Sequence, residues 1–386
     1  MRIFIKNLLL FVLPLAVFLA FPFTVLLWSG EFYPLDAIGK LSNGPQVILV
    51  GQAYNNYGPE LGLNAVIARE PRVITLGNSH VGAFSSMFFN DRSVFYNTTG
   101  MVGTLSDYVQ FVEQLKGKPP EIILANMEPN MFNPENAKNN VVRRSDLFAV
   151  RGQVYDPFFE SLFRNGGWWK VYADYFSGKF MLSDVFTAQQ DSVVTIGLRA
   201  LADRTGFTND GSNYPGDVIH NPANQSKILP AINELASTIS TNTKFNQYGN
   251  QISSEAIAEL KTFLSLCKSH GITVIGFFPP FAHEIYVALR EQYGQTESFK
   301  QLGPTLAALY AEYGFDFYDF SDITTFGSSD AEMVEIQHGS EKMYLRMFIV
   351  MADGTPALAQ LANTSFLKEK LASATSTYYV FGINGN

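Results

Sequence analysis

Cysteine and charge are both scarce in this chain of 386 residues. The single cysteine, Cys267, excludes an intramolecular disulfide, a CxxC redox pair and a zinc site built from several cysteines. Charged residues make up 16% of the chain, below the roughly 25% of an average soluble domain, and hydrophobic residues make up 47%, which excludes a disordered chain. The net charge is −8 and no run of Lys or Arg occurs, so no nucleic-acid partner is expected.

Long apolar runs are also scarce, since the sequence has a single one, at the N-terminus. Residues 8–28 carry no charge and follow Arg2 and Lys6. Since about 20 apolar residues span the hydrocarbon core of a bilayer, residues 1–29 are predicted to form an uncleaved transmembrane anchor. A cleaved signal peptide is the alternative, but its apolar region is usually about 7–15 residues long. The positive charges favour a cytoplasmic N-terminus, so residues 30–386 are expected on the extracytoplasmic side.

Strand patterns alternate with helical patterns through most of the chain after residue 60. The apolar runs typical of buried strands cover residues 73–76, 94–97, 121–125, 272–278 and 315–320. Helical patterns cover residues 60–69, 106–115, 254–269, 297–312, 340–352 and 356–372, with a further helical stretch from Val81. Because strands that alternate with helices form βαβ crossovers, the sequence predicts an α/β domain with a mainly parallel five-stranded sheet.

Two segments lie outside this alternation. Residues 30–70 are interpreted as a connector between the anchor and an α/β domain of residues 71–386. An insert of about residues 131–252, which contains Trp168 and Trp169, interrupts that domain. Inserts of this length are typical of a cap or binding element, and a surface subdomain with its own small aromatic core is the alternative.

Ligands of parallel α/β sheets bind beyond the carboxyl ends of the strands, so the residues that follow each strand are the candidates for chemistry. One such segment is Gly77-Asn78-Ser79-His80, at a predicted strand-to-helix turn. A serine at this position can attack an acyl carbon, and the backbone N–H groups of the helix start can hold the resulting oxyanion. An ordinary helix N-cap is the alternative role of Ser79.

A serine nucleophile needs a base, and the chain has five histidines: His80, His220, His270, His283 and His338. His338 lies after the last predicted strand, and Glu335 precedes it by three residues, close enough to fold back and accept a hydrogen bond from its ring. A surface turn is the alternative for this segment, and Asp330 is the alternative carboxylate. No other cluster of histidine with carboxylates recurs, so neither a metal nor another cofactor is expected.

The two segments together resemble the SGNH (GDSL-like) hydrolase superfamily. Its members carry Gly-Asp-Ser after the first strand and Asp-x-x-His before the last helix, and this chain has Gly77-Asn78-Ser79 and Glu335-Ile336-Gln337-His338 in the same order. The resemblance covers about residues 71–132 and 254–372. It implies a three-layer flavodoxin-like fold and a catalytic triad of Ser79, His338 and Glu335.

The resemblance also implies an oxyanion hole with three donors. These are the backbone of Ser79, a glycine after the second strand and an asparagine after the third. Gly100 and Asn130 fit the last two roles, with Gly103 and Asn126 as alternatives. His80 and His283, beside the same edge of the sheet, are the candidate substrate-binding residues.

Acyl-ester chemistry is what the superfamily implies for this chain. With its anchor, the chain is similar to membrane-anchored SGNH-like proteins of bacterial cell-surface acylation, which work beside a multi-spanning membrane-bound O-acyltransferase. We therefore expect a serine esterase or O-acyltransferase of the cell envelope. Its expected substrates are acyl esters, above all acetyl esters, of a cell-surface glycan or envelope polymer, and the expected intermediate is acyl-Ser79. A non-catalytic polymer-binding or scaffold protein on the same fold, partner of such an acyltransferase, is the alternative.

Overall fold

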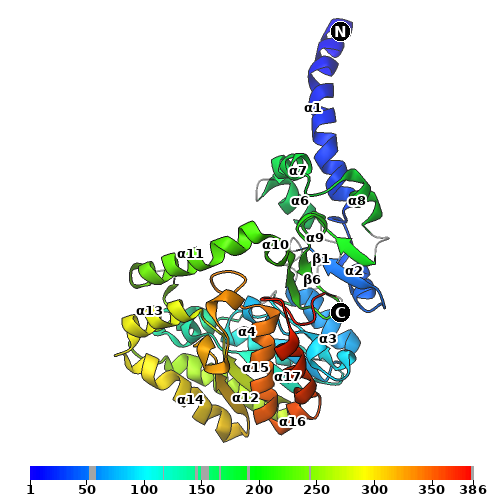
Figure 1. Cartoon of the computed structure of the whole chain (residues 1–386). Helices are drawn as coiled ribbons and strands as arrows, with labels where there is room; N and C mark the ends of the chain where they lie inside the picture. Colours follow the sequence, from blue (N-terminus) through cyan, green and yellow to red (C-terminus); the bar gives the residue numbers. More distant parts are fainter. Residues whose placement is uncertain are drawn as a thin grey trace. The chain divides into compact units, whose positions relative to one another are not determined.

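The computed structural model describes residues 1–51, 58–115, 117–143, 147–148, 156–164, 167–188, 192–242 and 245–383. The chain forms two compact units, each built from separate stretches of sequence (Figure 1). Unit 1 comprises Met1–Tyr57, Val150–Asn209 and Tyr214–Asp217. Unit 2 comprises Gly58–Ala149, Asp210–Asn213 and Val218–Asn386.

The core of unit 2 is a five-stranded sheet in which every neighbouring pair is parallel. Its order is β3 (Phe95–Tyr96), β2 (Val73–Leu76), β4 (Ile122–Asn126), β8 (Thr273–Phe278) and β9 (Asp316–Asp319). Numbered within the sheet, this is the 2-1-3-4-5 order of flavodoxin-like doubly wound folds. The predicted α/β class and parallel five-stranded sheet are therefore confirmed.

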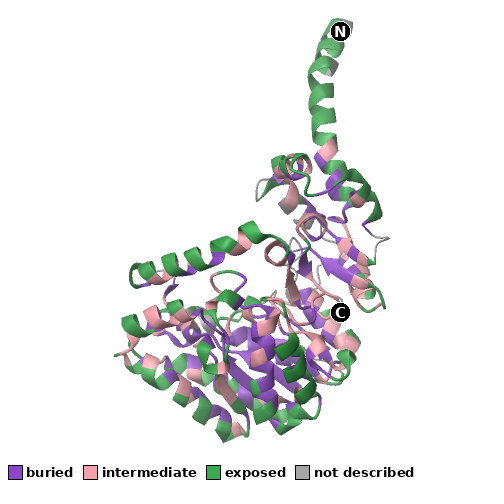
Figure 2. Cartoon of the chain, viewed as in Figure 1, coloured by how far each residue is buried: buried purple, intermediate pink, exposed green. Residues whose placement is uncertain are grey.

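Helices cover both faces of this sheet because its strands bury apolar side chains on both sides. Val73, Ile122 and Phe277 pack in one apolar cluster with the helices α11 (Pro222–Thr238), α13 (His283–Tyr293), α15 (Glu341–Gly354) and α17 (Thr364–Ser373). Ile74 and Ile123, one residue further along, pack in the other with α3 (Gly58–Arg69), α4 (Leu105–Gln114), α12 (Ser254–Ser269) and α14 (Glu297–Tyr313). The sheet is thus the buried middle layer of three (Figure 2).

Two predicted helices differ from the observed ones. The helix expected from Val81 is wrong: three short 3₁₀ turns stand there, η2 (Ser79–Val81), η3 (Ser86–Phe88) and η4 (Arg92–Val94). Each turn is capped by the side chain that precedes it, which accepts the backbone N–H of the residue two positions later. The capping residues are Asn78, Ser85 and Asp91. Such local side-chain bonds compete with a continuous helix. For the same reason the helix expected over 356–372 divides into α16 (Pro356–Ala359) and α17, which Asn363 caps.

Unit 1 contains a second, mixed sheet that the sequence did not predict. Its order is β5 (Val193–Ile196), β1 (Val47–Val50), β6 (Thr205–Phe207) and β7 (Asn213–Pro215). β1 pairs parallel with β5 and antiparallel with β6. The short helices α2 (Leu35–Ser42), α6 (Asp156–Phe163), α7 (Gly167–Phe176), α8 (Leu182–Thr187) and α9 (Leu198–Asp203) belong to the same unit.

The expected division into a connector and an insert differs from this grouping. β1 lies in the expected connector, residues 30–70, and its neighbour β5 lies in the expected insert, residues 131–252. The parts of the insert before residue 150 and after residue 217 join unit 2 with α5 (Pro134–Asn140) and α11, and α11 packs on α13. The short α10 (Gly216–Ile219) spans the boundary at Asp217. The physical reason is strand pairing, which joins residues more than 140 positions apart.

The N-terminal helix α1 (Arg2–Trp28) is the longest helix among the described residues. Its segment Ile3–Trp28 is long and apolar enough to cross a membrane, and it is the one such helix in the described part of the chain. Its N-terminal half is exposed along its length (Figure 2). A membrane-spanning helix needs no internal apolar partner, because lipid covers it.

Candidate active site

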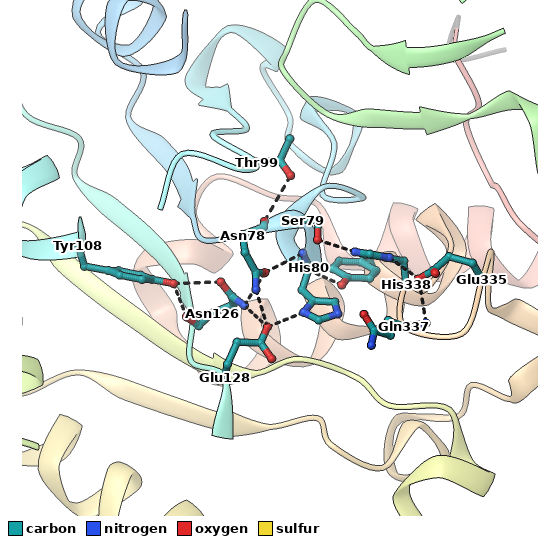
Figure 3. A network of polar contacts seen from close by, with 11 residues as sticks. Asn78, Ser79, His80, Thr99, Tyr108, Asn126, Glu128, Glu335, Gln337 and His338 are labelled. Carbon is teal, nitrogen blue, oxygen red and sulfur yellow. Dashed lines mark hydrogen bonds and ion pairs between the residues drawn. The ribbon is translucent and has the colours of Figure 1, made fainter. Parts of the chain in front are cut away.

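Ser79 and His338 meet at the carboxyl edge of the parallel sheet, although 259 positions separate them (Figure 3). The Ser79 Oγ lies 2.7 Å from the Nε2 of His338. Ser79 follows β2 directly and is exposed. Its alternative role as a helix cap is not observed, since Asn78 caps η2 by accepting the His80 N–H at 2.9 Å. The Ser79 hydroxyl is thus available to its histidine.

A tight hairpin presents His338. The backbone N–H of Val334 donates to the carbonyl of His338 at 2.9 Å, and Met333 and Gly339 form an isolated bridge. At the base of the hairpin, Glu332 is buried and accepts from Arg346 of α15 at 3.0 Å. The hairpin is therefore fixed to the helix that follows it.

Glu335 turns back within this hairpin onto the histidine. Its Oε1 accepts from the Gln337 backbone at 2.8 Å and from the Nδ1 of His338. Burial alone would raise the pKa of the Glu335 carboxyl, but the hydrogen bond and charge of His338 outweigh it and hold that pKa below its ordinary value. An ionised Glu335 fixes the tautomer of His338 with the proton on Nδ1, which leaves Nε2 free to accept the serine proton.

Asp330, the alternative carboxylate, has a different task. Its Oδ1 accepts the His283 backbone N–H at 2.5 Å and its Oδ2 that of Glu284 at 3.4 Å, so it caps the start of α13. The ring of His283 lies 3.0 Å from Asp322, in the loop after β9. The structure therefore joins Glu335, and not Asp330, to His338. The role of His283 in substrate binding stays a prediction.

A buried polar network lies directly behind the serine, and sequence reasoning missed its centre, Glu128. The Glu128 Oε1 accepts from the Nδ1 of His80 at 2.5 Å, from Asn126 at 2.9 Å and from Asn78 at 3.1 Å (Figure 3). The Tyr344 hydroxyl of α15 donates to the carbonyl of His80. The available signal was a carboxylate two residues after a fully buried strand, a position that is rarely charged without a partner.

His80 and Glu128 form an ion pair in this network. Burial would lower the pKa of the His80 imidazole, but the charge and hydrogen bond of Glu128 outweigh burial and raise it. Burial would raise the pKa of Glu128, but His80 lowers it for the same reason. The His80 side chain is 11% exposed, and its ring centroid lies 4.8 Å from that of His338. The ring of the expected substrate-binding His80 is thus engaged inside the protein, and contact with a substrate stays a prediction.

The expected oxyanion donors lie on the loops after β3 and β4. Gly100 stands in a turn closed by the Met101 N–H and the Thr98 carbonyl, with a φ of +75° that favours glycine. The preceding Thr99 bridges to Gly77, next to Ser79. The alternative Gly103 donates its N–H to Asp107 at 3.0 Å as part of the cap of α4.

The two candidate asparagines after β4 differ in what they contact. The Asn126 side chain is fully buried, and its Nδ2 donates to Asn78 and Glu128 while its Oδ1 accepts from Tyr108. Asn130 lies in η5 (Pro129–Phe132) and is partly exposed. Asn126 therefore supports the turn that carries Ser79. A Cβ at Gly77 would lie 1.8 Å from the Asn126 Oδ1, so only glycine allows this approach.

Comparisons with known proteins do not extend this picture. Neither a protein family nor a curated protein matches the chain. In the described residues, no group of three or more His, Cys, Asp or Glu is placed to hold a metal ion.

Proposed function

We propose that this chain is a membrane-anchored serine esterase or O-acyltransferase with an SGNH-type fold. The observation that carries the proposal is the chain of contacts from Ser79 through His338 to Glu335. A hydroxyl nucleophile, an imidazole base and a carboxylate that orients the base meet at the edge of a doubly wound sheet where ligands bind. The 2-1-3-4-5 strand order and the order of the sequence blocks support the SGNH assignment.

The proposed reaction begins with an acyl ester at the exposed Ser79. The Ser79 Oγ attacks the acyl carbon while its proton passes to the Nε2 of His338, and a tetrahedral oxyanion forms. The ester C–O bond then breaks, and His338 returns the proton to the departing alcohol. The products of this half-reaction are the free alcohol and acyl-Ser79.

The second half-reaction repeats these steps with a new nucleophile. His338 removes a proton from water or from a hydroxyl group, and the oxygen attacks the acyl carbon of acyl-Ser79. The serine ester bond breaks, and the proton returns to the Ser79 Oγ. Water gives a free acid and a hydroxyl gives a new ester, so the acceptor alone separates an esterase from an O-acyltransferase.

The backbone N–H groups of Ser79 and Gly100 and the side chain of Asn130 are proposed as the oxyanion donors. Ser79 and Asn130 stand at the ends of neighbouring parallel strands, β2 and β4. Gly100 follows the third neighbour, β3, and the Gly77–Thr99 bridge holds its loop beside the serine. Donors from three adjacent strand ends can converge on one oxygen without a change in backbone.

The anchor supports a substrate in the cell envelope. We propose that α1 holds the enzyme on the extracytoplasmic side of a bacterial membrane, where acyl esters of a cell-surface glycan or envelope polymer are its substrates. A multi-spanning membrane-bound O-acyltransferase is the proposed donor of acyl groups. The non-catalytic alternative has no observation in its favour, since the Ser79 hydroxyl is exposed and already hydrogen-bonded to its base.

The test is hydrolysis of a chromogenic acetyl ester by the full-length protein, with and without an acetyl-free polysaccharide acceptor. Turnover that is lost in Ser79→Ala and kept in Asp330→Asn supports the proposal. Acetyl transfer to the polysaccharide then distinguishes a transferase from an esterase. Hydrolysis that Ser79→Ala leaves unchanged would overturn the proposal.

A further inference from the structure

Exposed aromatic side chains gather on three short helices of unit 1. Outside α1, most of the exposed large apolar side chains of the described residues lie between positions 159 and 186. We name these residues and the rings packed with them the aromatic collar: Phe159, Phe163, Trp168, Trp169, Tyr172, Phe176 and Phe186. Phe176 is 79% exposed and Trp169 is 61% exposed. Patches of this kind mark a surface that meets another phase or another molecule.

The three helices that carry the collar, α6, α7 and α8, pack against the C-terminal half of α1 (Figure 1). Phe18 of α1 stacks on Tyr172 with ring centroids 4.9 Å apart and meets the edge of Trp168 at 5.2 Å. At the end of the helix, Trp28 meets Phe186 at 5.3 Å. The collar therefore extends over the last eleven residues of α1, from Phe18 to Trp28.

A span of α1 that ends at Trp28 places this contact within the thickness of a bilayer. At a rise of about 1.5 Å per residue, the ten steps from Phe18 to Trp28 span about 15 Å. The hydrocarbon core is about 30 Å thick, so a helix that spans it up to Trp28 has Phe18 near the middle of its path. The aromatic collar then lies at the level of one leaflet rather than in water.

A hydrogen bond from a side chain of α7 to the backbone of α1 fits this depth. Pro22 lacks an N–H, so the carbonyl of Phe18, four residues earlier, loses the donor that a regular helix would supply. The Tyr172 hydroxyl supplies one at 2.5 Å. Water satisfies such a carbonyl at no cost, but in hydrocarbon an unpaired carbonyl costs several kcal/mol and a protein donor is needed.

The charges of α7 lie on the other side of that helix. Trp169, Tyr172 and Phe176 are spaced three and four residues apart and share one face. Lys170 and Asp174 pair with each other across one turn, and Lys179 pairs with Asp174 at 3.3 Å. Asp174 is buried, so the paired charges lie on the side of α7 that packs within unit 1, and the aromatic side meets α1 and the surface of the unit.

We propose that α6, α7 and α8 insert into the leaflet that α1 reaches at its C-terminal end, with phospholipid acyl chains and headgroups as the partner of the aromatic collar. This inference rests on the proposed anchoring by α1. It goes beyond anchoring, since it makes the enzyme's contact with lipid a broad surface instead of a single helix. Such a surface restricts how unit 1 can turn about the axis of α1.

The chain's three tryptophans allow a direct test, because Trp28, Trp168 and Trp169 all belong to this region. The full-length Trp28→Phe protein is placed in nanodiscs of phosphatidylcholine with bromine on the upper acyl chain. We expect the fluorescence of Trp168 and Trp169 to fall to about half or less of its value in unbrominated lipid, with little quenching by aqueous iodide. Strong iodide quenching without quenching by brominated lipid would overturn the collar.

Two calibrating variants separate this proposal from the anchoring on which it rests. In a chain whose three tryptophans are replaced by Phe, Phe11→Trp reports the N-terminal half of α1, and Lys40→Trp reports the exposed surface of α2. Phe11→Trp should be quenched by lipid bromine and Lys40→Trp by iodide. Loss of bromine quenching at Phe11→Trp would refute the anchor itself. Its loss only at Trp168 and Trp169 would refute the collar alone.

A second measurement tests the depth without fluorescence. Tyr172→Phe removes only the hydroxyl, and Pro22→Ala returns an N–H to the Phe18 carbonyl. In lipid nanodiscs we expect Tyr172→Phe to lower the thermal midpoint in the wild-type background and to have almost no effect in the Pro22→Ala background. An equal loss in both backgrounds would show that the hydroxyl does not serve this carbonyl in lipid.

Discussion

The two sheets of this protein differ in how their strands are joined. In the parallel sheet of unit 2, β2, β3 and β4 follow one another in sequence, and helices connect most neighbours. In the mixed sheet of unit 1, β1 pairs with β5 although about 140 residues stand between them. The first arrangement brings successive strand ends to one edge, where loops can supply a nucleophile and its partners. The second pairs strands from distant parts of the chain in both parallel and antiparallel directions.

The two units also differ in the side chains that they expose. Unit 2 exposes polar groups beside its sheet edge, with Ser79 and His338 in contact. Unit 1 exposes aromatic rings around a long apolar helix. Under the proposed function, this difference assigns chemistry to unit 2 and attachment to unit 1. Changes in one unit should leave the property of the other intact.

The largest expected effect is the fall in turnover when the nucleophile or its base is removed. Ser79→Ala and His338→Ala should each lower the turnover of an acetyl ester by about 10⁴-fold or more, because neither residue acts without the other. The double variant should be hardly worse than either single one. Steady-state kinetics of all three variants is the measurement. Losses that multiply in the double variant would show that the two residues act independently.

The next effect separates Glu335 from the neighbouring carboxylate. Glu335→Gln keeps the length of the side chain but removes the charge that fixes the tautomer of His338, so turnover should fall by about 10⁴-fold. Asp330→Asn is the matched control, since Asp330 caps α13 and does not contact His338. It should retain nearly full turnover. A damaging Asp330→Asn together with a near-normal Glu335→Gln would refute the assignment of Glu335.

A stability effect is expected from the ion pair behind the serine. Glu128→Gln leaves His80 without its buried partner and should lower the free energy of unfolding by about 3–5 kcal/mol. The control is Glu121→Gln, which breaks the exposed Arg72–Glu121 pair and should cost about 0–1 kcal/mol. Urea unfolding of both variants measures the two values. Equal losses of unfolding free energy in the two variants would show that burial of the His80–Glu128 pair does not increase its contribution to stability.

The same pair sets a pH dependence. The pKa of His80 is raised in the folded protein, so its contribution to stability is complete below 6.5 and is lost as the pH rises through the folded value. The pKa of Glu128 is lowered, so its contribution is complete above 4.5 and is lost as the pH falls through the folded value. The difference in the free energy of unfolding between wild type and Glu128→Gln should therefore be largest between pH 4.5 and 6.5.

The smallest expected effect is on turnover when unit 1 is changed. Trp169→Ser combined with Phe176→Ser removes two exposed rings of the aromatic collar and touches none of the residues around Ser79. Hydrolysis of a small soluble ester in detergent should stay within about two-fold of wild type, as is usual for surface changes far from a site. A large fall in turnover under these conditions would contradict the separation of chemistry from attachment.

The sequence predicted unit 2 well because its signals are local. Four of the five strands of the parallel sheet are short, mainly apolar runs, and helix α12 begins at a capping serine, Ser253. The pairing of Ser79 with His338 could be predicted because both follow strands whose carboxyl ends share one edge. Glu335 could be predicted because its distance from His338 is a single turn.

The remaining features depend on contacts that no local pattern specifies. The apolar run of β1 has no feature that names β5 as its neighbour, so the mixed sheet was not predicted. The His80–Glu128 pair joins two loops 48 residues apart, and each residue taken alone is ordinary. The 3₁₀ turns after β2 were missed because apolar spacing suggested a helix, while three side-chain caps interrupt it.

The central claim is that Ser79 is a nucleophile activated by His338. The most direct measurement is covalent labelling of the full-length protein with a fluorophosphonate, followed by mass spectrometry of its peptides. We predict one phosphonylated residue, Ser79, with labelling that is lost in Ser79→Ala and strongly slowed in His338→Ala. Labelling of another serine, or labelling of Ser79 at the same rate without His338, would contradict the account.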